Sequence, residues 1–386
     1  MSTARRSVRR LPLRLTPVGI FSLTVSLIGC LAIYNATYHR PYPYLFVGRQ
    51  LVWLIIGSGA LAVTTSLSSR TLRRLTPLLL LIFYAALWLV LYAGIQINGM
   101  RGWFSYRGIF MQPSELGKPV FLLGAAWLVS HRADRRSWWA SYLVLFIFAI
   151  LWVLPILLEP DIGGALVYAL TFVGLCWCMG FRGTHLALSS LPCIPAVIVL
   201  FQWKPYLLER IQGFMHPELH PQTTGWHILQ FQKALAAGGI TGRSWGQGTW
   251  SQHFLPLPYS DSIFASLGEV IGFVGLLPFV LVVLAWLVYG WYRASRADTT
   301  FARALIVGVS LMLSTQAFLH LSVNLGLFPV TGLTLPLISY GGSSLVSTLT
   351  MIGLLEGAAL YDPEPSRPDT PDPEDEWIQD APNSEL

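Results

Sequence analysis

Long apolar runs dominate this chain and set the strongest limit on its fold. A bilayer core about 30 Å thick is crossed by about 20 apolar residues in an α-helix. Of the 386 residues, 54% are hydrophobic and only 11% are charged, a balance that soluble domains of this length do not show. The sequence therefore predicts an all-α polytopic membrane protein. Its ten predicted transmembrane helices begin near Pro17, Leu45, Leu75, Pro113, Trp138, Ile162, His185, Ile263, Phe301 and Leu335.

Basic residues between the runs predict the orientation, because Lys and Arg in short loops are retained on the cytoplasmic side. Arginines crowd the first 16 residues and alternate short loops, at Arg5, Arg6, Arg9, Arg10, Arg14, Arg70, Arg73, Arg74, Arg132, Arg135, Arg136, Arg182, Arg293, Arg296 and Arg303. The intervening short loops hold only Arg40, Arg101 and Arg107. Both termini are therefore predicted to be cytoplasmic. The net charge of +6 reflects this bias and does not indicate binding to nucleic acid.

Composition divides the chain into three parts. Residues 1–16 form a basic cytoplasmic N-terminus, 17–361 the membrane domain, and 362–386 an acidic, proline-rich tail. The tail has too little apolar surface to offset its ordering entropy, so we expect it to be disordered in the cytoplasm. Residues 204–262 form a large polar, extracytoplasmic loop between helices 7 and 8. Loops of this length usually carry function.

Few acidic residues lie near the membrane, and each needs an explanation because buried charges normally have partners. Glu115 and Lys118 are three residues apart, on one face of a helix, and are expected to pair. The pair is either a clamp between helices or a cation site for a substrate phosphate. Glu159 and Asp161 flank a proline in a short outer loop, where a solvated turn is favoured over a cation site.

The stretch "LPLPYSDSIFASLGEVIG" places Asp261 directly before a long apolar run. An aspartate there indicates a helix N-cap, although Ser260 can cap instead and free the carboxylate. Glu269 is interpreted as a structural hydrogen-bonding acid. Upstream, a short amphipathic segment marked by Ile228, Leu229, Phe231 and Leu235 predicts an interfacial helix. The loop aromatics suit either sugar rings or the lipid headgroup region.

Four stretches occur in order along the chain: "NGMRGWFSYRGIFMQPSELGK", "EPDIGGALV", "GWHILQFQKALAAGGITGRSWGQGTWSQHFLPLPYSDSIFASLGEVIG" and "GLFPVTGLTLPLISYGGSS". Together they resemble the signatures of the shape, elongation, division and sporulation (SEDS) family, which includes RodA, FtsW and SpoVE. The resemblance runs from about residue 17 to residue 360. The run "GQGTWSQ" looks more like RodA than FtsW.

The resemblance implies a peptidoglycan glycosyltransferase in the bacterial cytoplasmic membrane. Family members polymerise lipid II into glycan strands on the outer face, in cell wall synthesis and cell shape. The transfer inverts the anomeric centre, and undecaprenyl pyrophosphate leaves. The implied partners are lipid II, the growing glycan chain, membrane lipid and a class B penicillin-binding protein. A divalent cation (Mg or Mn) supports activity in the family, and its ligands are unknown here.

The resemblance also assigns residues to roles. It makes Asp261 the general base, and inverting transfer needs only one base plus positive charge beside the departing diphosphate. Glu269 is a supporting residue. The substrate-binding candidates that the resemblance gives are Arg101, Trp103, Glu115, Lys118 and Arg210. Ser260 and Ser339 are added as candidates from their place in the sequence, and for Ser339 a packing role stays open as the alternative.

Several positions depart from the family pattern. Members usually have Glu-x-His-Thr-Asp where this chain has Leu257, Tyr259, Ser260 and Asp261. Glu159 stands for a usual Gln, and His320 for a common Asn. Two alternatives stay open: a lipid II flippase, since carriers also combine intramembrane charges with broken helices, or a weakly active scaffold for a class B penicillin-binding protein.

Overall fold

The computed structural model of the protein describes residues 16–97, 99–132, 138–191, 195, 202 and 206–360. Within this part, seven helices are long and apolar enough to cross a membrane: α1 (Pro17–Thr37), α2 (Pro43–Ser66), α3 (Ser69–Ala93), α6 (Trp138–Leu158), α13 (Ile263–Ser295), α14 (Thr300–Asn324) and α15 (Gly342–Leu360). A further apolar helix, α7 (Ile162–Cys178), is shorter. A multi-pass helical membrane protein is therefore confirmed, while ten spans remain a prediction.

Three predicted spans differ from the helices observed. The fourth is divided into α4 (Pro113–Leu116) and α5 (Lys118–Arg132). The seventh contains α8 (Gly183–Ser190), and most of its remaining length lies outside the described residues. The last helix begins seven residues later than Leu335, because proline lacks a backbone N–H and disfavours helix just before it. Pro336 lies in the irregular segment that precedes α15.

The prediction of an all-α chain is wrong in one respect, because a three-stranded antiparallel sheet follows α3. Its strands are β1 (Ile95–Ile97), β2 (Met100–Tyr106) and β3 (Ile109–Met111), in the order β1-β2-β3. The β2–β3 turn has positive φ at both central residues, 51° at Arg107 and 79° at Gly108. Two left-handed residues in a two-residue turn match the right-handed twist of the flanking strands, which favours a hairpin.

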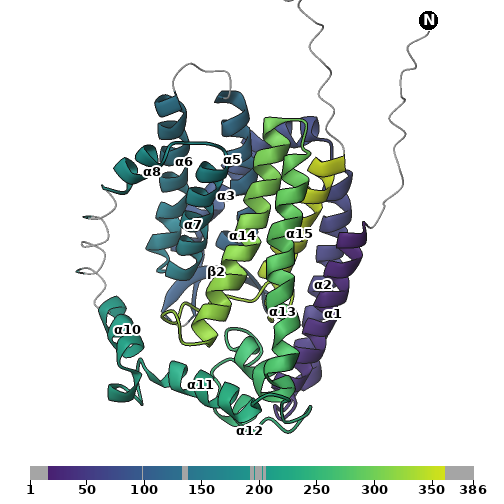
Figure 1. The fold of residues 1–386 in the computed structure, drawn as a ribbon, viewed down its shortest axis with the longest axis vertical. Helices are drawn as coiled ribbons and strands as arrows, with labels where there is room; N and C mark the ends of the chain where they lie inside the picture. The colour runs from purple at the N-terminus through teal and green to yellow at the C-terminus, as the bar shows by residue number, and fades with distance from the viewer. Residues whose placement is uncertain are drawn as a thin grey trace, which may run out of the picture.

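α14 lies at the centre of the bundle (Figure 1). It packs against α13, α15, α5 and α7, while α15 also packs along α2. The main core is built from buried apolar side chains of these central helices, such as Phe121, Tyr168, Leu305, Met312 and Leu349. The outer helices instead expose large apolar side chains, among them Ile55, Leu81 and Val288. Apolar surface on the outside of the bundle is expected where lipid is the solvent.

The predicted large loop folds into short helices across one end of the bundle (Figure 1). They are α10 (Tyr206–Met215), the 3₁₀ helix η1 (Pro217–Leu219), α11 (Trp226–Gly238) and α12 (Thr249–His253). The amphipathic segment is indeed a helix, α11. The expectation that its apolar face meets lipid is wrong at Phe231 and Ala234, which pack against Leu255, Ala265 and Val323 of the protein.

Residues 1–15 and 361–386 lie outside the described part. They include nearly all of the predicted basic N-terminus and the whole predicted acidic tail. The boundaries and roles given to those two segments therefore remain predictions.

Candidate active site

Asp261 lies in the loop after α12, two residues before α13. The hydroxyl of Ser260 donates a hydrogen bond to Asp261 Oδ1 at 2.9 Å. The N-cap residue of α13 is Ser262, and no side-chain cap hydrogen bond is formed there. Neither Asp261 nor Ser260 therefore serves as the helix cap. The Asp261 carboxylate is available for chemistry.

Asn324, in the last turn of α14, holds this loop. Its side-chain Nδ2 donates a hydrogen bond to the backbone carbonyl of Asp261 at 3.0 Å. Its Oδ1 accepts from the backbone N–H of Ala265 at 3.1 Å, which satisfies a free donor in the first turn of α13. Asn324 is fully buried. The α13 cap thus comes from a neighbouring helix.

The other side of the loop is held by the segment before α15. Ser339 Oγ donates to the carbonyl of Ser260 at 2.8 Å, and the backbone N–H of Tyr340 donates to the carbonyl of Tyr259 at 2.8 Å. Ser339 is buried, and its hydroxyl also accepts from the N–H of Leu335 at 2.8 Å. These contacts support a role for Ser339 in positioning the loop.

Asp261 lines a small pocket between α14, α11 and the segment before α15. The pocket is formed with Phe231, His320, Val323, Val330, Thr331, Gly332 and Leu333. Burial raises the pKa of Asp261 from 3.8 to about 6, and the Ser260 hydrogen bond opposes this rise. At neutral pH the carboxylate is mostly ionised, and it is a stronger base than an exposed aspartate.

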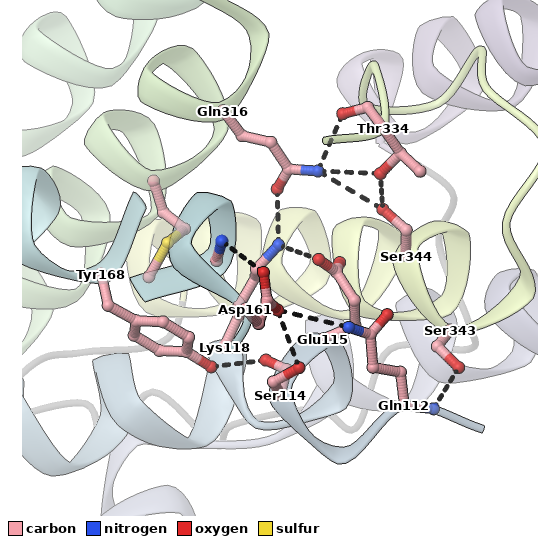
Figure 2. Close-up of polar contacts among 12 residues, drawn as sticks. Gln112, Ser114, Glu115, Lys118, Asp161, Tyr168, Gln316, Thr334, Ser343 and Ser344 are labelled. Atoms are coloured by element: carbon pink, nitrogen blue, oxygen red, sulfur yellow. Dashed lines mark hydrogen bonds and ion pairs between the residues drawn. The ribbon is translucent and has the colours of Figure 1, made fainter. Parts of the chain in front are cut away.

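Glu115 and Lys118 form a second polar centre deeper in the bundle, and the predicted pairing is confirmed. Lys118 Nζ lies 2.5 Å from Glu115 Oε1 and donates to Gln316 Oε1 at 2.8 Å (Figure 2). The Lys118 side chain is only 1% exposed, so a carboxylate inside the protein already balances its charge. This geometry favours the clamp between helices.

One face of α14 connects the two polar centres. Gln316 Nε2 donates to the carbonyl and hydroxyl of Thr334 at 3.0 and 3.1 Å (Figure 2). His320 Nδ1 lies 2.7 Å from the carbonyl of Leu333; because a carbonyl only accepts, Nδ1 carries the proton. Sequence reasoning missed Gln316 and Asn324. The signal was their spacing, since Gln316, His320 and Asn324 are four residues apart on one helical face.

Asp161 is part of the same region. Its Oδ1 accepts from the backbone N–H of Gly164 at 2.8 Å and caps α7. Its Oδ2 is 3.3 Å from Gln112 Nε2 and 3.4 Å from Ser114 Oγ (Figure 2). Burial raises the pKa of Asp161, and the Gly164 hydrogen bond opposes the rise. Asp161 is therefore held as a structural cap.

Glu159 shows that the predicted solvated turn is wrong. Its side chain is 0% exposed, and neither carboxyl oxygen has a hydrogen-bond partner within the described residues. The β-hairpin covers it: a Cβ added at Gly102 would lie 2.8 Å from Glu159 Oε2. Burial raises the pKa of Glu159 to about 9, and the charge of Asp161 adds to this. Glu159 is therefore neutral at pH 7.

The predicted cations do not meet at the Asp261 pocket. Arg101 and Trp103 lie on β2, where Arg101 is exposed and its Nη1 is 3.5 Å from the Leu91 carbonyl. Arg210 is exposed on α10. None of these residues, nor Lys118, lines the pocket that Asp261 lines.

Glu269 accepts hydrogen bonds from the backbone N–H groups of Trp250 and Ser251, at 2.9 and 2.6 Å. These groups lie in the first turn of α12, so Glu269 makes the hydrogen bonds expected of a structural acid. In the described residues, no group of three or more His, Cys, Asp or Glu side chains is arranged to hold a metal ion. Within this part of the chain the residues do not form a ligand set for the expected divalent cation, which stays a prediction.

Comparison with known proteins decides the family. The sequence model of one family, FTSW_RODA_SPOVE, described as "Cell cycle protein", matches residues 14–362. The chain belongs to the FtsW/RodA/SpoVE family.

Two relatives show how far this similarity extends. A protein of Mycobacterium tuberculosis named "Probable peptidoglycan glycosyltransferase FtsW" is 34% identical over 346 residues, which cover 87% of this chain and 66% of that protein. The chain thus spans slightly less than two thirds of that FtsW. "Stage V sporulation protein E" of Bacillus subtilis is 31% identical over 356 residues, 89% of this chain and 96% of that protein.

Two solved structures share the fold. One is reported under the description "Structural coordination of polymerization and crosslinking by a peptidoglycan synthase complex"; it is 30% identical with a TM-score of 0.74, covering 88% of this chain and 96% of that one. The rod shape determining protein RodA of Thermus thermophilus is 28% identical with a TM-score of 0.66, covering 88% and 95%. Both FtsW and RodA match, so the RodA-like assignment remains a prediction.

Proposed function

We propose that this chain is a peptidoglycan glycosyltransferase that polymerises lipid II on the outer face of the bacterial cytoplasmic membrane. Family membership and the names of its relatives support the activity. The observation that carries the proposal is the Asp261 carboxylate: it lines a pocket, it does not cap a helix, and burial raises its pKa to about 6. A partly buried carboxylate that does not cap a helix and has a raised pKa is what a general base requires.

Asp261 accepts the proton of the 4-hydroxyl on the acceptor sugar. The oxygen of that hydroxyl attacks the anomeric carbon of the donor sugar, the one linked to the diphosphate. A new carbon–oxygen bond forms, and the bond from that carbon to the diphosphate breaks on the opposite face, which inverts the configuration. The diphosphate leaves with both electrons and needs no general acid, because it is already a weak base. Ser260 donates a hydrogen bond to Oδ1 of Asp261, which favours the other carboxylate oxygen, Oδ2, as the proton acceptor.

The remaining site residues have supporting roles in this proposal. Arg101, Trp103 and Arg210 contact the substrate from the outer hairpin and from α10. Glu115 and Lys118 keep the helices beneath the pocket in register, as their 2.5 Å pair supports. Undecaprenyl pyrophosphate is the leaving group.

The proposed partner is a class B penicillin-binding protein that crosslinks the new strands. Its support is the similarity to a chain of a complex that coordinates polymerization and crosslinking. The proposed context is cell wall synthesis during elongation. In this proposal both termini lie in the cytoplasm, and α10, α11 and α12 lie on the extracytoplasmic side of the membrane.

Purified protein in detergent micelles, supplied with lipid II and its partner, tests the activity. We expect a ladder of glycan strands on a denaturing gel. Micelles have no second compartment, so a lipid carrier forms no polymer there. Absence of polymer, together with lipid II transport in liposomes, would contradict the enzyme and favour a flippase. Partner binding with neither activity would identify a scaffold.

A further inference from the structure

A positively charged pocket lies beside the start of α2, on the same end of the bundle as the Asp261 loop. It is a cavity of about 270 Å³ lined by Arg40, Pro41, Tyr42, Leu45, Phe46 and Arg49. A water molecule occupies about 30 Å³ in the liquid, so this space accepts a group much larger than one or two waters. Its two charged lining residues are both arginines.

The charges of both arginines lack an acidic partner within the described residues. In the part of the chain that the structure describes, neither Arg40 nor Arg49 forms an ion pair with a carboxylate. The Arg40 guanidinium instead lies over two aromatic rings, 4.9 Å from the Tyr259 ring centre and 5.9 Å from that of Phe46. These contacts hold the guanidinium in place and leave its charge uncompensated. The pocket is therefore prepared for an anion.

The wall of this pocket contacts the loop that carries Asp261, through Tyr259. Phe46, Tyr259 and Tyr340 form an aromatic cluster, with ring centres 4.8 Å apart for Phe46–Tyr259 and 5.6 Å for Tyr259–Tyr340. Gln50, one residue beyond Arg49, donates to the Ser339 carbonyl at 3.2 Å and accepts from the Gly341 N–H at 3.3 Å. The start of α2 is thus fixed to the segment that also holds the Asp261 loop.

We propose that Arg40 and Arg49 form the subsite for the diphosphate of a polyprenyl diphosphate lipid. This proposal rests on the proposed function. The reaction requires positive charge at the diphosphate, and Lys118 is already neutralised by Glu115. Guanidinium groups bind phosphate oxygens in pairs of hydrogen bonds, which suits a diphosphate.

The surface beside the pocket fits the remainder of such a lipid. Leu45 lines the pocket, and Val52 and Ile55 on the same helix are exposed. An apolar helix surface below a cationic pocket accommodates a polyprenyl tail with its headgroup at the arginines. A phospholipid also has a phosphate above an apolar tail, so the experiment must separate these two sources of anion.

Binding of farnesyl diphosphate to the purified protein in phosphatidylcholine nanodiscs tests the subsite. The variants are Arg40→Gln, Arg49→Gln and the double substitution. Arg107→Gln is the matched control, since Arg107 is an exposed arginine on the outer hairpin and outside the pocket. We expect roughly tenfold weaker binding for each single change and more for the double, with Arg107→Gln unchanged. Unchanged Tm and elution profiles show that the variants are folded.

Two further arms decide the source of the anion. Farnesyl monophosphate should bind at least several-fold more weakly than the diphosphate, and nanodiscs containing phosphatidylglycerol should leave diphosphate binding in place. Wild-type affinity in the folded double variant would overturn the proposal. Complete displacement by phosphatidylglycerol would also overturn it, since the arginines would then bind bulk lipid.

The failure of this subsite is distinguishable from the failure of the enzyme. Asp261→Asn should bind farnesyl diphosphate like the wild type while forming no polymer. Arginine-dependent binding in a protein that never polymerises lipid II would refute the proposed activity and leave the subsite in place. Polymerisation that is unaffected in the double variant would refute the subsite alone.

Discussion

The side-chain amide of Asn324 donates a hydrogen bond to the backbone carbonyl of Asp261 at 3.0 Å. The same side chain accepts from the N–H of Ala265 at 3.1 Å, so the end of α14 fixes both the candidate base and the first turn of α13. A residue 63 positions away in the chain thereby sets the position of the Asp261 carboxylate. Small displacements of a catalytic group reduce rates strongly.

Replacing Asn324 with alanine should lower the polymerisation rate about 10- to 100-fold, because the Asp261 loop loses its contact with α14. Asn35→Ala is the matched control: Asn35 is also buried and accepts from the Gly246 N–H at 2.8 Å, away from Asp261. Both changes should lower the Tm to a similar extent. Equal rates for the two variants would show that Asn324 has no positioning role.

The pH dependence of polymerisation should follow Asp261. With its pKa at about 6, the base is mostly protonated at pH 5 and mostly ionised at pH 7, so the rate should rise about tenfold over this interval. Ser260→Ala removes a hydrogen bond that lowers this pKa, and should move the midpoint to higher pH. A midpoint unchanged in Ser260→Ala would contradict the assignment.

Glu159→Gln should raise the stability at neutral pH. Burial raises the pKa of Glu159 from 4.5 to about 9, so the folded protein binds the proton more tightly than the unfolded chain. The wild type therefore loses stability as the pH rises from about 4.5 towards 9, and the glutamine variant does not. The Tm difference between the variant and the wild type should be larger at pH 8 than at pH 5. A difference that does not change with pH would show that Glu159 is not held in its neutral form in the folded protein.

The Glu115–Lys118 pair predicts strong coupling in a double-mutant cycle. Lys118→Met or Glu115→Gln alone leaves one buried charge or polar group without its partner and should cost about 3–5 kcal/mol. The double substitution should cost clearly less than the sum. Thermal unfolding of the four proteins in one detergent measures the coupling, and additive losses would mean that the two charges do not interact.

The helical part of the fold was readable from the sequence because each span is a continuous apolar run. The starts of α1, α6, α7 and α13 agree closely with the predicted starts. The β-hairpin was missed because its strands are short and lie among apolar residues, where the period of two is hard to see. Its one local sign was the Arg107–Gly108 turn.

The site was predictable in parts. Glu115 and Lys118 were found because a three-residue spacing alone brings side chains together in a helix. The contacts of Asp261 were not, since Asn324 and Ser339 come from elements 63 and more residues away in the chain. The burial of Glu159 depends on the hairpin packed over it, which no local pattern contains.

The central claim is that Asp261 is the general base, and polymerisation of lipid II by purified Asp261→Asn tests it most directly. Removing an ionised carboxylate from a partly buried position should not lower the Tm at pH 7.5, so loss of folding will not mimic loss of chemistry. Glycan strands should fall below detection in this variant, while Arg107→Gln forms them at the wild-type rate. Near-normal strand formation by a folded Asp261→Asn protein would contradict the account.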